Sequence, residues 1–279
     1  MPFLDPRLLR ITMDIGAQRK TYADLAMTVT CTKFANPNPA ECNITIANVG
    51  RSDIDFILTE GSPFNPNRDP TVSRSITVEV GRESTGLNLL YTGDIHRTSI
   101  TQPPDALISI RALTKAGQKG NILARNAPPV ASLSFIAQQI ANDLDVALVF
   151  EATDIQVANY AFTGPALRQV EKLQELANIN VYIDNNELIV KDENVPRAGR
   201  VRRLSAENGM IGVPNFTDRG ANVTALYDNQ TVAGGELEVV SVQYPALTGR
   251  YFVYKLNYTL TNRDTPFYYV AECRRVIGG

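Results

Sequence analysis

The chain has 279 residues, 44% of them hydrophobic, which is enough for two or three domains that each bury a core. Its formal net charge of −2 argues against a general nucleic-acid binder, which carries a basic surface excess. No apolar run is long enough to cross a bilayer and the first residues lack the layout of a signal peptide, so we expect no membrane insertion and a protein made and kept in a cytoplasm.

The amino-terminal part of the chain carries hydrophobic residues at every second position several times over. This alternation is typical of half-buried antiparallel strands, and we predict strands over residues 9–15, 27–31, 42–46, 76–80 and 108–110. The segments 34–39 and 61–70 are rich in proline and asparagine and are predicted to be exposed loops. Residues 81–86 should form a hairpin loop and no phosphate cradle, since no helix follows them.

The three cysteines, Cys31, Cys42 and Cys273, are an odd number. Cys31 and Cys42 lie on separate predicted strands, so a disulfide framework is not expected and the thiols are interpreted as structural and reduced.

His96 is the only histidine, which excludes multi-histidine metal sites. On an extended strand Asp94, His96 and Thr98 would share one face, which allows an acid-base pair or, as we prefer, a polar outer face of a sheet. Glu171 and Glu175 could likewise be a carboxylate pair but are interpreted as a solvated helix face. We therefore predict no catalytic, metal-binding or cofactor-binding residues, and no cofactor.

The middle of the chain, residues 121–197, changes to a helix-and-strand pattern. Ser132 can cap a helix whose apolar face is formed by Leu133, Ile136, Ala137, Ile140 and Leu144. Residues 146–150 are predicted to form a strand, and a second helix should start at Pro165. Residues 180–183 and 188–190 are predicted to form a hairpin. The pattern resembles the small helix-strand domains at the amino end of secretins, which alone says little about function.

The carboxyl-terminal part begins with the one marked charge run, Arg197, Arg200, Arg202 and Arg203. Arg200 and Arg202 should share one side of the chain if this segment is extended. The run is either a solvated linker or a surface for an acidic protein partner. Strands follow over residues 223–227, 237–242, 251–260 and 267–276, and Phe252, Tyr254, Leu256, Tyr258 and Leu260 should line one face.

These patterns predict a mainly β protein with an α/β insert: a first β-domain at 1–120, the insert at 121–197 and a second β-domain at 198–279. Three stretches carry a resemblance to baseplate hub proteins of contractile-tailed bacteriophages. They are residues 36–49 (Asn-Pro-Asn-Pro-Ala-Glu-Cys-Asn-Ile-Thr-Ile-Ala-Asn-Val), residues 91–95 (Tyr-Thr-Gly-Asp-Ile), and residues 249–269, which begin Gly-Arg-Tyr-Phe-Val-Tyr-Lys-Leu-Asn-Tyr.

The resemblance implies two tail-tube-like β-barrels per subunit and a homotrimeric ring that joins the tail tube to the central spike. Its implied partners are the tail tube protein, the spike protein and, in the channel, the tape-measure protein, without sequence-specific nucleic-acid binding. The implied location is the virion tail, assembled in the host cytoplasm. The candidate protein-interface residues are Arg197, Arg200, Arg202, Arg203 and Phe64, the last in the predicted loop 61–70. The alternatives are a tail tube or another baseplate structural protein, or a cell-wall hydrolase that uses carboxylates.

Overall fold

The computed structural model describes residues 5–62, 72–102 and 106–276. The elements of the amino-terminal flank are β1 (Arg7–Ile15), β2 (Gln18–Tyr22), β3 (Met27–Phe34), β4 (Glu41–Ala47), α1 (Arg51–Gly61), β5 (Arg74–Arg82), β6 (Gly86–Ile100) and β7 (Leu107–Leu113), followed by a 3-10 turn at Ala116–Gly120. The strands form an antiparallel sheet with the order β3-β4-β7-β6-β5-β1-β2. The predicted strands of this flank are confirmed, as is the hairpin loop between β5 and β6.

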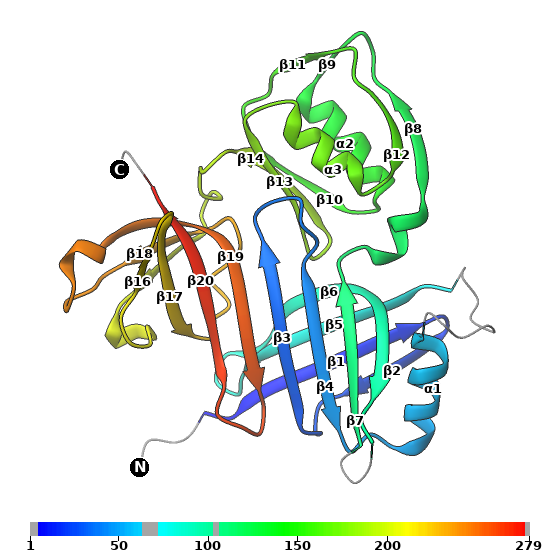
Figure 1. Ribbon diagram of the computed structural model, residues 1–279, viewed down its shortest axis with the longest axis vertical. Coiled ribbons are helices and arrows are strands. Elements are labelled where there is room, and N and C mark those ends of the chain that lie inside the picture. Colours follow the sequence, from blue (N-terminus) through cyan, green and yellow to red (C-terminus); the bar gives the residue numbers. More distant parts are fainter. Residues whose placement is uncertain (1–4, 63–71, 103–105, 277–279) are drawn as a thin grey trace.

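The insert lies beyond the ends of β3 and β4, at the top of the view (Figure 1). A three-stranded sheet with the order β10-β14-β13 carries two helices, and two short antiparallel ribbons, β8 with β12 and β9 with β11, extend from it. The elements are β8 (Ile122–Asn126), β9 (Val130–Ser132), α2 (Leu133–Asp143), β10 (Ala147–Glu151), β11 (Gln156–Ala158), β12 (Ala161–Pro165), α3 (Arg168–Glu175), β13 (Ile179–Asp184) and β14 (Glu187–Asp192).

The first helix of the insert follows the sequence prediction closely. The hydroxyl of Ser132 accepts a hydrogen bond from the backbone N–H of Phe135 at 3.2 Å and caps α2. The predicted apolar face is fully buried in a hydrophobic cluster that belongs to the insert alone. Burial of one such Leu or Ile side chain stabilises the fold by about 1.5 to 3 kcal/mol, so the insert holds a core of its own.

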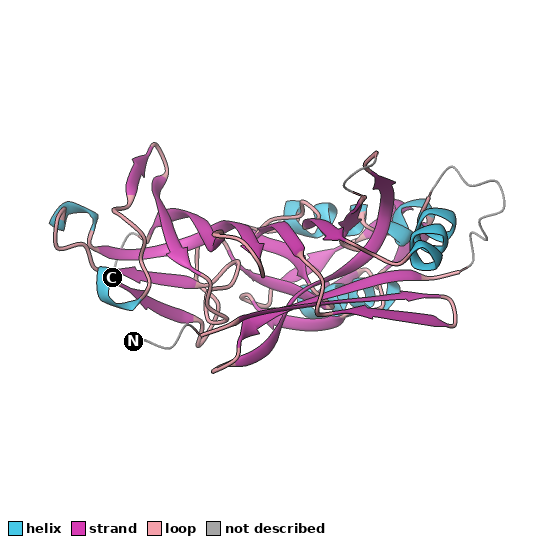
Figure 2. Ribbon diagram, turned by 90° about the horizontal axis from the view of Figure 1, so that it is seen from below, coloured by secondary structure: helices cyan, strands magenta, loops and turns pink. Residues whose placement is uncertain are grey.

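The carboxyl-terminal flank is again antiparallel sheet, apart from a parallel pair formed by β15 and β18. Its elements are β15 (Val201–Leu204), β16 (Asn215–Thr217), β17 (Gly220–Leu226), β18 (Glu236–Val239), β19 (Gly249–Thr261) and β20 (Phe267–Arg275), with 3-10 turns at Ala206–Asn208 and Pro245–Leu247. Figure 2, seen from below, shows that strands predominate over helices in the molecule.

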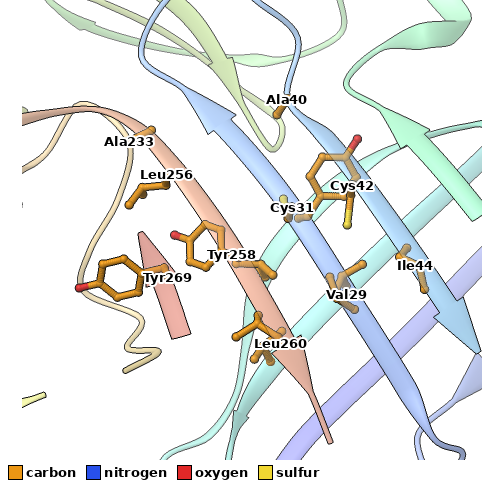
Figure 3. Packing of buried hydrophobic residues seen from close by; sticks show 14 of the residues in the cluster. Val29, Cys31, Ala40, Cys42, Ile44, Ala233, Leu256, Tyr258, Leu260 and Tyr269 are labelled. Carbon is orange, nitrogen blue, oxygen red and sulfur yellow. The ribbon is translucent and has the colours of Figure 1, made fainter. Parts of the chain in front are cut away.

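The two flanks meet in one continuous sheet. β19 pairs with β3 from Lys255↔Phe34 to Thr261↔Thr28, and this pairing, which we call the seam, joins 13 strands of the described residues. Side chains from both flanks, among them Val29 and Leu260, pack in one hydrophobic cluster across the seam (Figure 3). The division of the chain into a first barrel at 1–120, an insert at 121–197 and a second barrel at 198–279 stays a proposal.

The structure differs from the sequence analysis at four points. Residues 51–61 form α1, which we did not predict, and its start at Gly50 has no side-chain cap. Pro165 ends β12, and α3 starts at Arg168. The strand predicted over 237–242 ends at Val239, and Val242 is exposed in the loop that follows.

The fourth point concerns the inner face of β19. A β-bulge shifts the register between Val253 and Lys255, so Leu256, Tyr258 and Leu260 keep the buried face of the sheet while Phe252 turns to the other face. An extra residue in one strand reverses the alternation of the side chains beyond it. Phe252 thereby comes to lie against the insert, beneath Lys191.

Candidate interaction surface

The turn between β13 and β14 fixes the insert to the amino-terminal flank, and the hairpin reaches down to the sheet (Figure 1). Asp184 accepts a hydrogen bond from Lys33 of β3 at 2.6 Å, with the two side chains 11% and 8% exposed. Its neighbour Asn185 accepts from Lys33 at 3.3 Å and from the backbone N–H of Thr92 at 3.1 Å. One loop of the insert therefore binds two strands of the flank through buried polar contacts.

The same hairpin also contacts the carboxyl-terminal flank and the chain beside the seam. The hydroxyl of Tyr182 donates to the carbonyl of Ala233 at 3.0 Å, and Asn180 donates to the carbonyl of Ala35 at 2.9 Å. Gly234 has a φ of +76°, and a Cβ atom there would lie 2.0 Å from the hydroxyl oxygen of Tyr182. A glycine is required at this position both for its backbone conformation and for the close approach. The insert is thus anchored on both flanks.

A buried lysine lies at the contact between the insert and the carboxyl-terminal flank. Lys191 is 1% exposed, and its Nζ has no hydrogen-bond partner among the described residues. The ammonium group lies 4.3 Å from the centre of the Phe252 ring, an arrangement in which a cation is attracted to the face of the ring. Burial lowers the pKa of Lys191 to about 8, although the Glu151 carboxylate acts in the opposite direction.

The structure separates the four arginines of the charge run. Arg197 is buried, with its Nη2 3.4 Å from Glu187, and its backbone N–H donates to the carbonyl of Gly234 at 2.8 Å. Its Nε has no partner within the part of the chain that the structure describes. Arg197 therefore stabilises the anchor of the insert and does not present its guanidinium to a partner protein.

The other three arginines divide into one that is held within the chain and two that are exposed. Arg202 contacts Asp228 at 3.3 Å and donates to the carbonyl of Asn208 at 2.9 Å. Arg203 lies on β15 with its side chain 67% exposed and 3.8 Å from Glu238, and Arg200 is exposed just before the strand. Only Arg200 and Arg203 of this run are free to meet another molecule. Phe64, the fifth candidate, lies outside the described residues.

The candidate chemical groups are not gathered into a catalytic site. His96 is the extra residue of a bulge in β6, since Ile95 pairs with Ala112 and Arg97 with Arg111. The bulge places Thr98 on the buried face with Ile95, so Asp94, His96 and Thr98 do not share one face as expected. Glu171 and Glu175 are exposed and pair with Arg168 and Lys172 on the same helix, as the solvated-face interpretation predicted.

A polar cavity of about 800 Å³ lies between the amino-terminal flank and the insert, lined by hydroxyl, amide and carboxylate groups. A hydrolase that uses carboxylates needs two apposed acidic groups, one of which is kept protonated by burial. Of the two acidic residues in this cavity, Asp145 is exposed and Asp94 accepts a hydrogen bond from the N–H of Gly117 at 2.8 Å. The cavity does not provide that arrangement.

The described residues contain no group of three or more His, Cys, Asp or Glu side chains placed to hold a metal ion. None of the helices formed by residues 5–62, 72–102 and 106–276 is long and apolar enough to cross a membrane.

Solved structures similar in fold include two tail proteins and a component of the type VI secretion system. The 43 kDa tail protein of prophage MuSo2 from Shewanella oneidensis has a TM-score of 0.64 at 9% identity, covering 96% of this chain and 98% of that one. A tail protein from Neisseria meningitidis has a TM-score of 0.62 at 9% identity, covering 96% of each chain. The Escherichia coli c3393 protein, described as a component of the type VI secretion system that is similar to the bacteriophage T4 tail proteins gp27 and gp5, has a TM-score of 0.59 at 10% identity, covering 95% of this chain and 76% of that one.

The sequence itself gives the more specific result. No curated protein matches it. Residues 8–273, however, match the family described as baseplate hub gp41. The match spans both flanks and the insert, in agreement with the structural similarity to tail proteins. The chain belongs to the baseplate hub gp41 family of phage tail structural proteins.

Proposed function

We propose that three copies of this chain form a ring that joins the tail tube to the central spike and surrounds the channel of the tail. The proposal refines the family's role as a baseplate hub and phage tail structural protein. Its partners would be the tail tube protein, the spike protein and the tape-measure protein that passes through the channel, and its place the tail of the virion after assembly in the host cytoplasm. We propose no enzymatic activity for this chain.

The observation that carries the proposal is the seam. Two antiparallel flanks of similar strand content stand side by side in one sheet and share one core. If each flank acts as one tube-like unit, three chains supply six units around a channel. A threefold assembly can then match a sixfold tube on one side and a threefold spike on the other.

The free edges of the sheet support the same proposal. Among the described strands, the hydrogen-bonded path ends at β2 on the amino-terminal side and at β16 on the carboxyl-terminal side. On β16 the Phe216 side chain is 66% exposed. Unpaired edges with exposed apolar side chains promote pairing with another chain, and a closed ring removes both edges. A tail tube subunit, the main rival, would use its edges in the same way, so the number of copies in the ring distinguishes the two.

We expect the purified chain to form trimers at high concentration or beside its partners. Light scattering coupled to size exclusion measures the mass in solution, for which the 30.6 kDa chain is the unit. Electron microscopy of particles should show a ring of three subunits with a central hole. A chain that stays monomeric at every concentration and in the assembled particle would contradict the proposal, and a ring of six identical chains would favour a tube subunit.

We expect the double reversal Arg200→Glu with Arg203→Glu to weaken assembly while the chain stays folded. Both side chains are exposed, Arg200 just before β15 and Arg203 on it, where they can meet carboxylates of a neighbouring chain or of the tube. At low salt the yield of complete baseplates should fall by about tenfold, and the difference should shrink at high salt because exposed charges are screened. Electron microscopy of mixtures with the partner proteins counts the baseplates.

The matched control reverses two exposed charges on the insert, Arg168→Glu with Lys172→Glu. This variant should assemble like the parent. Arg202 is left unchanged, because its reversal would place a glutamate beside Asp228 and disturb the fold. Equal yields for the Arg200/Arg203 variant and the parent at both salt concentrations would show that the run is a solvated linker.

A further inference from the structure

Cys31 and Cys42 face each other on neighbouring strands. They are direct partners in the antiparallel register of β3 and β4, one step from the end of the ladder at Thr32↔Glu41. The two side chains are 2% and 0% exposed and lie on the same buried face of the sheet (Figure 3). The two thiols are therefore held together in the core by the register of one hairpin.

The distance between two such residues is close to that required for a disulfide. Directly opposed residues of an antiparallel pair have Cβ atoms about 4.5 to 5.5 Å apart, and a disulfide needs about 3.5 to 4.5 Å. In the register of the hairpin the two side chains lie next to each other on the buried face of the sheet. A small local shift and a rotation of the side chains bring the sulfur atoms together without moving either strand out of register.

We propose that Cys31 and Cys42 form a modification site at which a two-electron oxidant joins β3 to β4 by a disulfide. Each thiol loses a proton and one S–S bond forms, while the two electrons pass to the oxidant. With diamide, the thiolate of one cysteine adds to the N=N bond, and the second thiolate displaces the resulting hydrazine. Two thiols and one azo compound thus give one disulfide and one hydrazine.

The place of the bond in the sheet defines its effect. β3 pairs with β4 on one side and with β19 on the other, so it is the strand of the amino-terminal flank that forms the seam. A force that pulls β19 away from the amino-terminal flank acts first on β3, which can separate from β19 or, together with β19, from β4. A bond between Cys31 and Cys42 closes the second route and ties the seam strand to the rest of its flank.

Burial makes this oxidation slow in the folded chain. Burial and the neighbouring Cys31 raise the pKa of the Cys42 thiol, and only the thiolate attacks an oxidant. A cytoplasm keeps thiols reduced, whereas the medium outside a cell oxidises them. The pair would therefore be reduced during assembly and oxidised after release. This timing depends on the proposed location in the virion, but the chemistry of the pair does not.

The test uses the full chain treated with diamide at pH 7.5 and pH 9, quenched in acid, unfolded and blocked with N-ethylmaleimide. Trypsin cuts after Lys20, Lys33 and Arg51, which separates peptide 21–33 with Cys31 from peptide 34–51 with Cys42. We expect the two peptides to be linked after oxidation and released by a reductant. The rate should rise about tenfold for each pH unit below the pKa of the thiol.

Two variants make the result specific. Cys273→Ala removes the third buried cysteine and should leave the linked peptide unchanged, whereas Cys42→Ala should abolish it. The proposal is overturned if the oxidised parent yields peptides 21–33 and 34–51 separately, each carrying the maleimide, or if Cys273 takes the place of either partner.

A second arm examines purified virions collected directly into N-ethylmaleimide. The linked peptide in virions, and its absence in chain taken from the cytoplasm, supports the timing. Linkage in the isolated chain together with free thiols in virions overturns the timing and leaves the chemistry of the site intact. A chain that links but forms no ring would contradict the proposed function alone.

Discussion

Replacement of Asp184 by alanine is expected to lower the free energy of unfolding by about 3 to 5 kcal/mol. The substitution leaves the ammonium group of Lys33 buried without its charge partner, and the side chain of Lys33 is only 8% exposed. Urea unfolding should show a midpoint lower by about 1 M or more, and high salt should not restore it, because buried charges are poorly screened.

Two control variants separate the buried pair from other causes. Lys33→Met with Asp184→Leu removes both charges and should unfold close to the parent, because a buried ion pair is often no better than apolar residues of similar size. Glu41→Ala breaks an ion pair on the neighbouring strand, Arg111 with Glu41, whose side chains are 47% and 32% exposed, and should cost less than about 1 kcal/mol. An Asp184→Ala variant as stable as the parent would show that the hairpin tip does not anchor the insert.

Replacement of Lys191 by methionine is expected to stabilise the folded chain by about 2 kcal/mol near neutral pH. Methionine keeps the length of the buried side chain and its contact with Phe252 but removes an ammonium group that has lost its water without gaining a hydrogen bond. The loss of the cation-ring attraction offsets part of the gain.

The pH dependence of this effect has a definite sign. The pKa of Lys191 is about 8 in the folded protein, below its ordinary value of 10.5. Between these values the unfolded chain holds a proton that the folded chain has released, so the stability of the parent rises with pH across this window. Below pH 8 the ammonium group is protonated in both the folded and the unfolded chain, so the full free-energy cost of burying its charge is present. The advantage of the Lys191→Met variant should therefore be largest at pH 7.5 and smaller at pH 9.5.

Urea unfolding of parent and variant at both pH values measures this difference, and the comparison cancels the titration of groups common to both chains. The substitution leaves the charged neighbours of the Lys191 ammonium group unchanged, namely Glu151, Asp192 and Arg197. Lys172→Met, at an exposed position of α3, should change stability by less than about 0.5 kcal/mol at either pH. A Lys191→Met variant that is less stable than the parent at pH 7.5 would show that the ring contact outweighs the cost of burial.

The parts of the fold that depend on local sequence could be predicted. The cap at Ser132, the apolar face of α2 and the hairpin of β13 and β14 each depend on residues a few positions apart. α1 escaped prediction because Gly50 supplies no capping side chain and only Ile57 and Gly61 of the helix are buried. Pro165 suggested the start of a helix, but proline also fits an edge strand such as β12, which ends at this residue.

The features that define the interaction surface depend on pairings between distant segments. The bulges at His96 and before Lys255 reverse which side chains face the core, and no residue pattern indicated them. The four arginines of the run looked alike in the sequence. In the structure Arg197 is buried beside Glu187, and Arg202 is held by Asp228. The burial of Lys33 and Lys191 could not be predicted from the sequence, since it follows from how the insert packs on the two flanks.

The seam also has a consequence for the order in which the chain folds during synthesis. Thr32 of β3 donates a hydrogen bond to Asn257 of β19, 225 residues further along the chain. At about 5 to 20 residues per second, a ribosome needs from about ten seconds to most of a minute to make that partner. During this time β3 has one unpaired edge, while the insert, with its own core, can already fold. A nascent chain of this kind needs protection from aggregation until its last strands emerge, and folding should be slow because its final pairing joins segments so far apart.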